Sequence, residues 1–189
     1  MDSGQHAAPK NSKIWLKLRN FVLSLAVVMG LAYVMSEYVA IAYAVPSSSM
    51  ESTIHAGDKV YAEQLSYYFR DVEPGDIITF EDPSDPDKIL LKRCVAVGGQ
   101  SVDFKDGCLY VDDVLMTENY TEGKPTNPFV DTQEAIVYPY TLSEGQLWVM
   151  GDNRTNSKDS RYFGAIDTAS VKKRVFIVLW PFERMGMIE

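Results

Sequence analysis

The feature of this sequence that most constrains its fold is a long apolar segment close to the N-terminus. No charged residue occurs from Phe21 to Ser36, and apolar residues continue past Glu37 to Val45. About 25 such residues cross a hydrocarbon core about 30 Å thick as a helix with some tilt. Aromatic side chains, which favour membrane interfaces, stand near its two ends: Trp15, Tyr38 and Tyr43. The sequence therefore predicts one transmembrane helix over residues 20–44.

Charge is divided unequally along the chain. Residues 1–20 have a net charge of +3 and the whole chain −8, which leaves −11 for the remainder. Basic residues stay on the cytoplasmic side of a membrane, which predicts a cytoplasmic tail over residues 1–19 and an extracytoplasmic domain over residues 45–189. The chain is thus expected in the cell (plasma) membrane, with the lipid bilayer as a partner. The acidic balance argues against binding of nucleic acid through its phosphates.

A cleaved signal peptide is the alternative interpretation of the same region. Ala42-Tyr43-Ala44 has the small-x-small pattern of a cleavage site. The apolar segment is, however, longer than the roughly 7–15 apolar residues of a typical signal peptide. We therefore favour a retained anchor.

Short apolar segments separated by turn residues follow the predicted anchor. They predict strands at residues 59–63, 77–80, 89–97, 101–104, 108–111, 114–116, 147–150 and 175–180. Asp106-Gly107 predicts a hairpin turn, residues 82–87 a loop, and the polar residues 117–134 an exposed insertion. The predicted fold class is mainly β, a compact β-sheet or barrel-like domain preceded by one N-terminal transmembrane helix.

Cysteines and histidines are too few for a structural metal site. The cysteines are Cys94 and Cys108, and the histidines are His6 and His55, whereas zinc sites use more ligands at closer spacing. We therefore predict no metal and no cofactor. A disulfide between the two cysteines stays open as an alternative, but two buried free thiols are the favoured interpretation.

Three consecutive serines, Ser47 to Ser49, follow the apolar segment between Pro46 and Met50. A polar loop leaving a membrane is one interpretation, although a flexible linker has no need of large apolar neighbours. A nucleophilic serine needs a base to take its proton. His55 is close in sequence, but as the only histidine outside the tail it is interpreted as a solvated loop residue.

Lys92 is the alternative candidate for a base. It lies in an apolar strand, after residues 89–91 and before residues 95–97. Lysine normally has a pKa of about 10.4, but burial disfavours its charged form and lowers the pKa. The competing interpretation is that strand alternation directs Lys92 to solvent.

Three segments together resemble the bacterial type I signal peptidases, which are membrane-anchored Ser–Lys endopeptidases. Residues 46–54 (PSSSMESTI) are similar to the nucleophile segment of that family, P-S-x-S-M-x-P-T-L. Residues 91–93 (LKR) resemble its lysine segment, and residues 149–164 (VMGDNRTNSKDSRYFG) nearly all of its G-D-N-R segment. The resemblance extends from the anchor to Phe182 and is closest to the smaller, single-span members.

The resemblance implies a role for each matching residue. Ser49 would be the nucleophile and Lys92 the general base. The hydroxyl of Ser47 and the backbone N–H of Ser49 would stabilise the oxyanion. Ser157 would donate a hydrogen bond to the Lys92 amine and hold it toward Ser49.

The resemblance also implies supporting residues. Asp159 and Arg161 would form a structural ion pair behind the site, and residues 151–154 would shape a turn. The walls of shallow pockets for small substrate side chains would come from Val45, Met50, Ile54 and Leu91. Departures from the family pattern occur at Ser52, Gly99-Gln100, Thr155 and Phe163, and none removes a group that the mechanism needs.

The function implied is removal of N-terminal signal peptides from exported preproteins at small-x-small sites on the outer face of the cytoplasmic membrane. One alternative is a self-cleaving Ser–Lys protease of the repressor type, but the anchor and the absence of a DNA-binding module argue against it. A second is an anchored β-module that binds peptides without cleaving them. The presence of both Ser49 and Lys92 argues against that module. The sequence indicates no oligomeric state.

Overall fold

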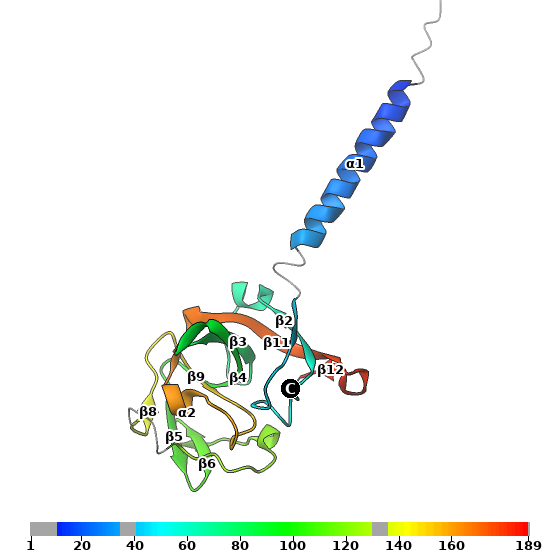
Figure 1. Ribbon diagram of the computed structural model, residues 1–189. Coiled ribbons are helices and arrows are strands. Elements are labelled where there is room, and N and C mark those ends of the chain that lie inside the picture. Colours follow the sequence, from blue (N-terminus) through cyan, green and yellow to red (C-terminus); the bar gives the residue numbers. More distant parts are fainter. Residues whose placement is uncertain (1–10, 35–40, 130–135, 189) are drawn as a thin grey trace, which may run out of the picture. The chain divides into compact units, whose positions relative to one another are not determined.

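The computed structural model describes residues 11–34, 41–129 and 136–188 of the chain. The chain divides into two units, Met1–Val39 and Ala40–Glu189. The first unit contains helix α1 (Asn11–Val34), within which Lys13–Tyr33 is long and apolar enough to cross a membrane (Figure 1). Large apolar side chains along this helix are exposed, a surface that suits lipid rather than water.

The end of the apolar segment differs from the prediction. The helix ends at Val34, and Ile41–Ala44 form strand β1, antiparallel to β2 (Lys59–Glu63). The last residues of the predicted anchor over 20–44 therefore belong to the β-rich unit. Apolar composition does not distinguish a membrane helix from a strand whose backbone is satisfied by a neighbouring strand. Residues 1–10 of the predicted tail and residues 35–40 lie outside the described residues.

The larger sheet of the second unit has the strand order β1-β2-β11-β3-β4-β9-β10, with β12 beside β11. Its further strands are β3 (Ile77–Asp82), β4 (Asp85–Val97), β9 (Gln146–Met150), β10 (Ile166–Asp167), β11 (Val171–Trp180) and β12 (Gly186–Met187). Strand β4 pairs antiparallel with β3 and with β9, and Lys92 lies opposite Ile78 of β3. Lys92 is thus carried by an internal strand of the sheet.

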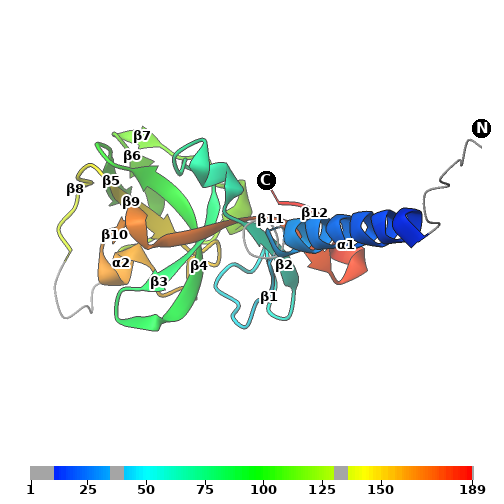
Figure 2. The same cartoon turned by 90° about the horizontal axis from the view of Figure 1, so that it is seen from above.

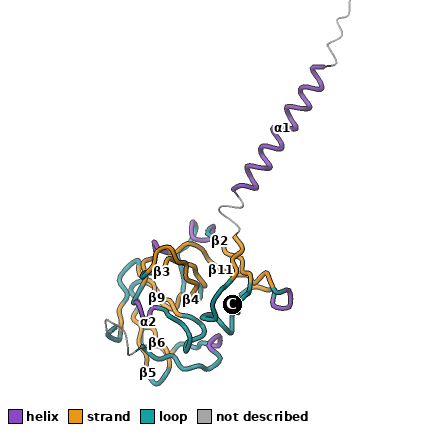
Figure 3. The backbone as a smooth tube through the Cα atoms, in the orientation of Figure 1, coloured by secondary structure: helices purple, strands orange, loops and turns teal. Residues whose placement is uncertain are grey.

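A second sheet has the order β7-β6-β5-β8. Its strands are β5 (Ser101–Lys105), β6 (Cys108–Val111), β7 (Val114–Leu115) and β8 (Tyr140–Thr141). Figures 1 and 2 show it at the end of the β-rich unit away from β1, β2 and β12. The other helices are short: η2 (Leu65–Tyr68), η3 (Asn119–Thr121), α2 (Ser160–Phe163), η4 (Thr168–Ser170) and η5 (Phe182–Arg184). Strands and loops make up most of this unit (Figure 3), so the predicted mainly β fold class is confirmed.

Buried apolar side chains cover both faces of β4. On one face, the cluster around Trp148 joins Val95 and Ala96 of β4 to the second sheet. On the other face, Cys94 belongs to a cluster with Ile78 and Phe80 of β3. Because both faces of the strand are packed, a side chain in the middle of β4 is directed into the protein rather than to solvent.

Each strand expected from the sequence is present, with small differences at the ends, but two loop predictions are wrong. Residues 82–87 are not a loop, because β3 and β4 continue to a two-residue turn at Pro83-Ser84. Residues 117–134 are not wholly exposed, because Thr121 and Thr126 are buried; residues 130–135 lie outside the described part of the chain. Turn-forming composition predicts where the backbone bends, not how far the flanking strands pair.

Both cysteines are free, as the favoured interpretation expected, but only one of them is buried. Cys94 is buried and Cys108 is exposed. Burial raises the pKa of the Cys94 thiol to about 12. Cys108 is exposed because it begins β6 directly after the hairpin turn at Asp106-Gly107.

Trp148 should be a major source of stability for the β-rich unit. Its side chain is fully buried, and the rings of Tyr138 and Tyr140 lie 6.0 and 4.9 Å from its ring. Trp148→Ala should lower the free energy of unfolding by about 3–5 kcal/mol. Denaturant unfolding of the detergent-solubilised chain measures this. Trp180→Ala is the matched control, because Trp180 is 47% exposed, and an equal loss in both variants would contradict the assignment of Trp148 to the core.

Candidate active site

The serine cluster lies on a closed loop between β1 and β2. The backbone N–H of Val45 donates to the carbonyl of Asp58, and that of Gly57 to the carbonyl of Val45, both at 2.8 Å. Met50 and Ile54 are fully buried and pack into the cluster beneath the loop. These two side chains are therefore anchors of the loop. Neither of them lines the cavity beside Ser49 and Lys92, because the turn that follows Ser49 directs them into the core. Their role as pocket walls stays a prediction.

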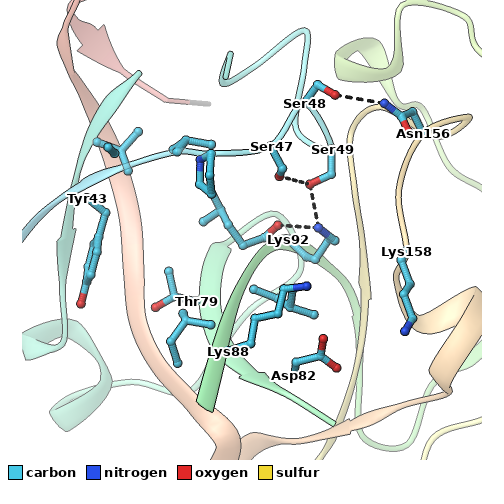
Figure 4. Close-up of a pocket in the computed structure, with 17 residues that line it drawn as sticks. Tyr43, Ser47, Ser48, Ser49, Thr79, Asp82, Lys88, Lys92, Asn156 and Lys158 are labelled. Carbon is cyan, nitrogen blue, oxygen red and sulfur yellow. Dashed lines mark hydrogen bonds between the residues drawn. The ribbon is translucent and has the colours of Figure 1, made fainter. Parts of the chain in front are cut away.

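The side chain of Lys92, from β4, contacts the side chain of Ser49 on this loop. The Lys92 amine donates a hydrogen bond to Ser49 Oγ at 2.7 Å and another to the carbonyl of Leu91 at 3.0 Å (Figure 4). Both side chains are buried. Burial lowers the pKa of Lys92 to about 8; the charge of Asp159 opposes this shift and that of Lys88 adds to it. The amine is therefore neutral in a minority of molecules near physiological pH, but in far more of them than an ordinary lysine amine would be.

Ser47 lies on the other side of Ser49. The two hydroxyl oxygens are 3.3 Å apart, and either hydroxyl can be the donor (Figure 4). Ser47 itself is exposed, so its hydroxyl is free to turn toward a bound ligand. Besides the Lys92 amine, the Ser49 oxygen therefore has a second polar neighbour, the hydroxyl of Ser47.

The turn after β9 lies against the serine loop. The backbone N–H of Asn153 donates to the carbonyl of Ser49 at 3.1 Å, and its side-chain amide to the carbonyl of Ser48 at 3.0 Å. The side-chain amide of Asn156 donates to Ser48 Oγ at 3.0 Å. The turn predicted to have only a shaping role therefore also contacts the serine segment directly.

Ser157 does not make the hydrogen bond expected of it. Its hydroxyl is buried and has no partner, whereas the amine of Lys92 is bonded to Ser49 and Leu91. Gly151 lies beside it: a Cβ at this position would clash with the Ser157 side chain and with the carbonyl of Ser49. Ser157 is thus inside the site but is not linked to Lys92 in this structure.

Arginine–carboxylate pairs involve several residues in and beside the turn after β9. Arg161 contacts both carboxylate oxygens of Asp159 at 2.9 Å, and the same carboxylate accepts from the backbone N–H of Gly151 at 3.0 Å. The predicted Asp159–Arg161 pair is therefore present. The other two pairs join Arg93 to Asp152 and Arg154 to Glu118, and sequence reasoning found neither, because their partners come from distant segments.

A cavity of about 470 Å³ opens beside Ser49 and Lys92. Val45 and Leu91, both predicted as walls, line it, together with Tyr43 and Ile89. Lys88 and Lys158 also line it and add positive charge (Figure 4). The cavity is thus mainly apolar near the serine and takes its shape from β1, the serine loop and β4.

His55 lies on the same loop but takes no part in this arrangement. Its Nδ1 atom is 4.0 Å from the Asp58 carboxylate and forms no hydrogen bond. Its side chain is 39% exposed, which agrees with the interpretation of a loop residue. Lys92 is the basic side chain that contacts Ser49.

A serine hydroxyl bonded to a buried amine of lowered pKa, beside a mainly apolar cavity, is the arrangement that a serine hydrolase with a lysine base would need. Residues 18–180 match the family model described as signal peptidase, peptidase S26. The chain belongs to this family, and it is a signal peptidase and a serine endopeptidase.

The similarity to individual relatives covers most of the chain. The chain is 32% identical over 190 residues to a probable signal peptidase I-2 of Synechocystis, covering 97% of this chain and 81% of that protein. It is 30% identical over 234 residues to a probable signal peptidase I of Mycobacterium leprae, covering 94% and 80%. It is 31% identical over 226 residues to a signal peptidase I of Mycobacterium tuberculosis, covering 90% and 75%.

Gly151 should be irreplaceable, because no side chain fits between Ser157 and the carbonyl of Ser49. Gly151→Ala should displace the serine loop and reduce peptidase activity by at least about 100-fold, since small misplacements of reacting groups have effects of this size. Gly186→Ala is the matched control, because a Cβ there meets nothing within 4 Å. Both variants are assayed with a signal-peptide substrate, and wild-type activity in Gly151→Ala would contradict the close packing described here.

Proposed function

We propose that Ser49 and Lys92 form the catalytic dyad of this signal peptidase, and that it removes N-terminal signal peptides from exported preproteins. The observation that carries this proposal is the 2.7 Å hydrogen bond between the buried Lys92 amine and Ser49 Oγ. The lowered pKa of Lys92 supports it, because a base must be unprotonated at the working pH. Ser49 is the hydroxyl to which the amine of Lys92 donates.

The reaction begins with the neutral amine of Lys92 taking the proton of Ser49 as its oxygen attacks the scissile carbonyl. The oxyanion that forms is stabilised by the Ser47 hydroxyl and the backbone N–H of Ser49. The ammonium of Lys92 then gives its proton to the leaving amine, and an acyl-enzyme on Ser49 remains. Lys92 next takes a proton from the water that attacks the ester, and it gives this proton to Ser49 Oγ as the acyl group leaves. The serine hydroxyl and the neutral amine are thereby restored.

Ser157 and one ion pair support the dyad. Ser157 is the residue that orients the Lys92 amine during the reaction, since its hydroxyl is buried, unpaired and beside the carbonyl of Ser49. The Asp159–Arg161 pair holds the backbone of Gly151 and thereby the turn that touches Ser48 and Ser49.

The substrate is a peptide with small side chains at the −1 and −3 positions. Val45 and Leu91 line the cavity next to the reacting groups and would form apolar walls against these side chains. Cleavage therefore follows a small-x-small sequence.

The enzyme acts at the outer face of the cytoplasmic membrane. Basic residues before the apolar helix favour a cytoplasmic N-terminus, which places residues 45–189 outside. An anchor close to Ser49 in sequence confines the nucleophile to the layer in which membrane-inserted preproteins present their cleavage sites, and this raises the effective concentration of the two.

Cleavage of a membrane-inserted preprotein by the detergent-solubilised full chain tests the dyad. The wild type should cut after a small-x-small site, and Ser49→Ala and Lys92→Met should each lose at least about 10³-fold in kcat. The matched controls are Ser170→Ala and Lys105→Met, which change a half-buried and an exposed residue outside the cavity. Near-wild-type cleavage by folded Ser49→Ala or Lys92→Met would refute the assignment of that residue.

The pH dependence of kcat/KM tests the protonation state of Lys92. Because the base must be neutral and burial lowers its pKa to about 8, activity should rise with pH and reach half its maximum near that value. Below the pKa the rate should fall about tenfold per pH unit. A rate that stays constant from about pH 8 down to about pH 6 would count against Lys92 as the base.

A further inference from the structure

The backbone at Ser52 has a conformation that side chains rarely adopt. Ser52 lies three residues after Ser49 and has φ 103°, a backbone conformation that is strained for a residue with a side chain. Proline, which the family pattern has at this position, is fixed near φ −65° and cannot form this turn. Proline therefore could not replace Ser52 in this turn, and a strained backbone of this kind persists only where a surrounding contact holds it.

That contact comes from the segment 118–126. The hydroxyl of Ser52 donates a hydrogen bond to the backbone carbonyl of Tyr120. Tyr120 belongs to η3, far from Ser52 in sequence. The side chain of Ser52 therefore links the strained turn to a part of the chain that sequence reasoning treated as an exposed insertion.

Tyr120 is itself held between two arginines. The guanidinium carbons of Arg93 and Arg154 lie 4.1 and 5.7 Å from the centre of its ring. The hydroxyl of Tyr120 donates to Glu118 at 3.0 Å, and Glu118 accepts two hydrogen bonds from Arg154 at 2.6 Å. Each arginine is thus fixed by a carboxylate, because Asp152 binds Arg93 through two donors at 2.8 and 2.9 Å.

Two more hydrogen bonds fasten the same segment to the turn after β9. The hydroxyl of Thr126 accepts from Arg154 at 2.8 Å, and the amine of Lys124 donates to Asn153 at 3.3 Å. Asn153 also holds the carbonyls of Ser48 and Ser49. The segment 118–126 therefore reaches the serine loop by two routes, through Ser52 and through Asn153.

We propose that the segment 118–126 braces the serine turn, and that Ser52 and Tyr120 are positioning residues that keep Ser49 Oγ within reach of Lys92. This inference rests on the proposed Ser49–Lys92 dyad. None of the residues of the brace lines the cavity beside the dyad. Loss of the brace therefore reduces the fraction of time in which Ser49 is aligned for attack and leaves the substrate-binding surface intact.

The test is the steady-state kinetics of the full chain on a preprotein substrate, with kcat and KM measured separately. Ser52→Ala removes the hydrogen bond to Tyr120, and Tyr120→Ala removes the ring between the arginines. Each should reduce kcat by about 10-fold to 100-fold with KM unchanged within about twofold. The double variant should be no slower than the slower single variant, because both changes break the same link.

Conservative and matched variants separate positioning from folding. Tyr120→Phe keeps the ring between Arg93 and Arg154 and should retain kcat within about threefold of the wild type. Ser170→Ala also removes a hydroxyl that donates to a backbone carbonyl, and Tyr110→Ala removes a ring that contacts the amine of Lys105. Both variants should leave kcat unchanged. Unfolding curves identify any variant that fails to fold. If Tyr120→Ala fails to fold, Ser52→Ala carries the test and Tyr120→Phe is its control.

Wild-type kcat in both Ser52→Ala and Tyr120→Ala would overturn the brace, as would multiplicative effects in the double variant or an effect on KM alone. Ser49→Ala and Lys92→Met are measured in the same assay. If these two are inactive while the brace variants are fully active, only the brace is wrong. If Ser49→Ala remains active, the proposed dyad is wrong instead.

Discussion

The exclusion of water from one amine nitrogen is the constraint on which the rest of this structure depends. Lysine can act as a base near physiological pH only where burial disfavours its charged form, and the protein achieves this by placing Lys92 on an internal strand with packed faces. The amine keeps two hydrogen-bond partners, Ser49 Oγ and the carbonyl of Leu91. These bonds offset part of the cost of burying a polar group. The sheet therefore has two effects: it positions Lys92, and by burying the amine it lowers the pKa of that side chain.

Around that amine the protein uses buried ion pairs for geometry more than for stability. Replacing buried pairs by apolar side chains is often neutral for stability, because desolvation offsets much of their attraction. Arg161 with Asp159, and Arg154 with Glu118, each have two-point geometry, which fixes direction as well as distance. Such pairs suit a turn whose backbone must stay against the serine segment without a side chain at Gly151.

The sequence predicts those features of the site that are local. Lys92 stands in an apolar strand, a pattern that suggested a buried base but left its direction open, and the resemblance to a family then assigned its role. The same resemblance, rather than spacing, supplied the Asp159–Arg161 pair. Contacts between distant segments left no such signal: the Ser52 hydroxyl meets the carbonyl of Tyr120, and no residue type is needed to supply a carbonyl. The sequence also did not reveal the direction in which a side chain of the serine loop points. Met50 follows Ser49 directly, yet the tight turn sends its side chain into the core, which an alternation of apolar and polar residues does not reveal.

The unequal exposure of the two thiols has a practical consequence. Cys94 is buried with its pKa raised to about 12, whereas Cys108 is exposed at the start of β6. Only the thiolate reacts with alkylating reagents, so a maleimide dye will label the native chain at Cys108 alone. Because Cys108 lies outside the cavity, the label reports position without blocking the enzyme. A membrane-impermeant maleimide applied to intact cells then shows which side of the membrane the β-rich unit occupies. Cys108 is labelled only if this unit lies outside the cell.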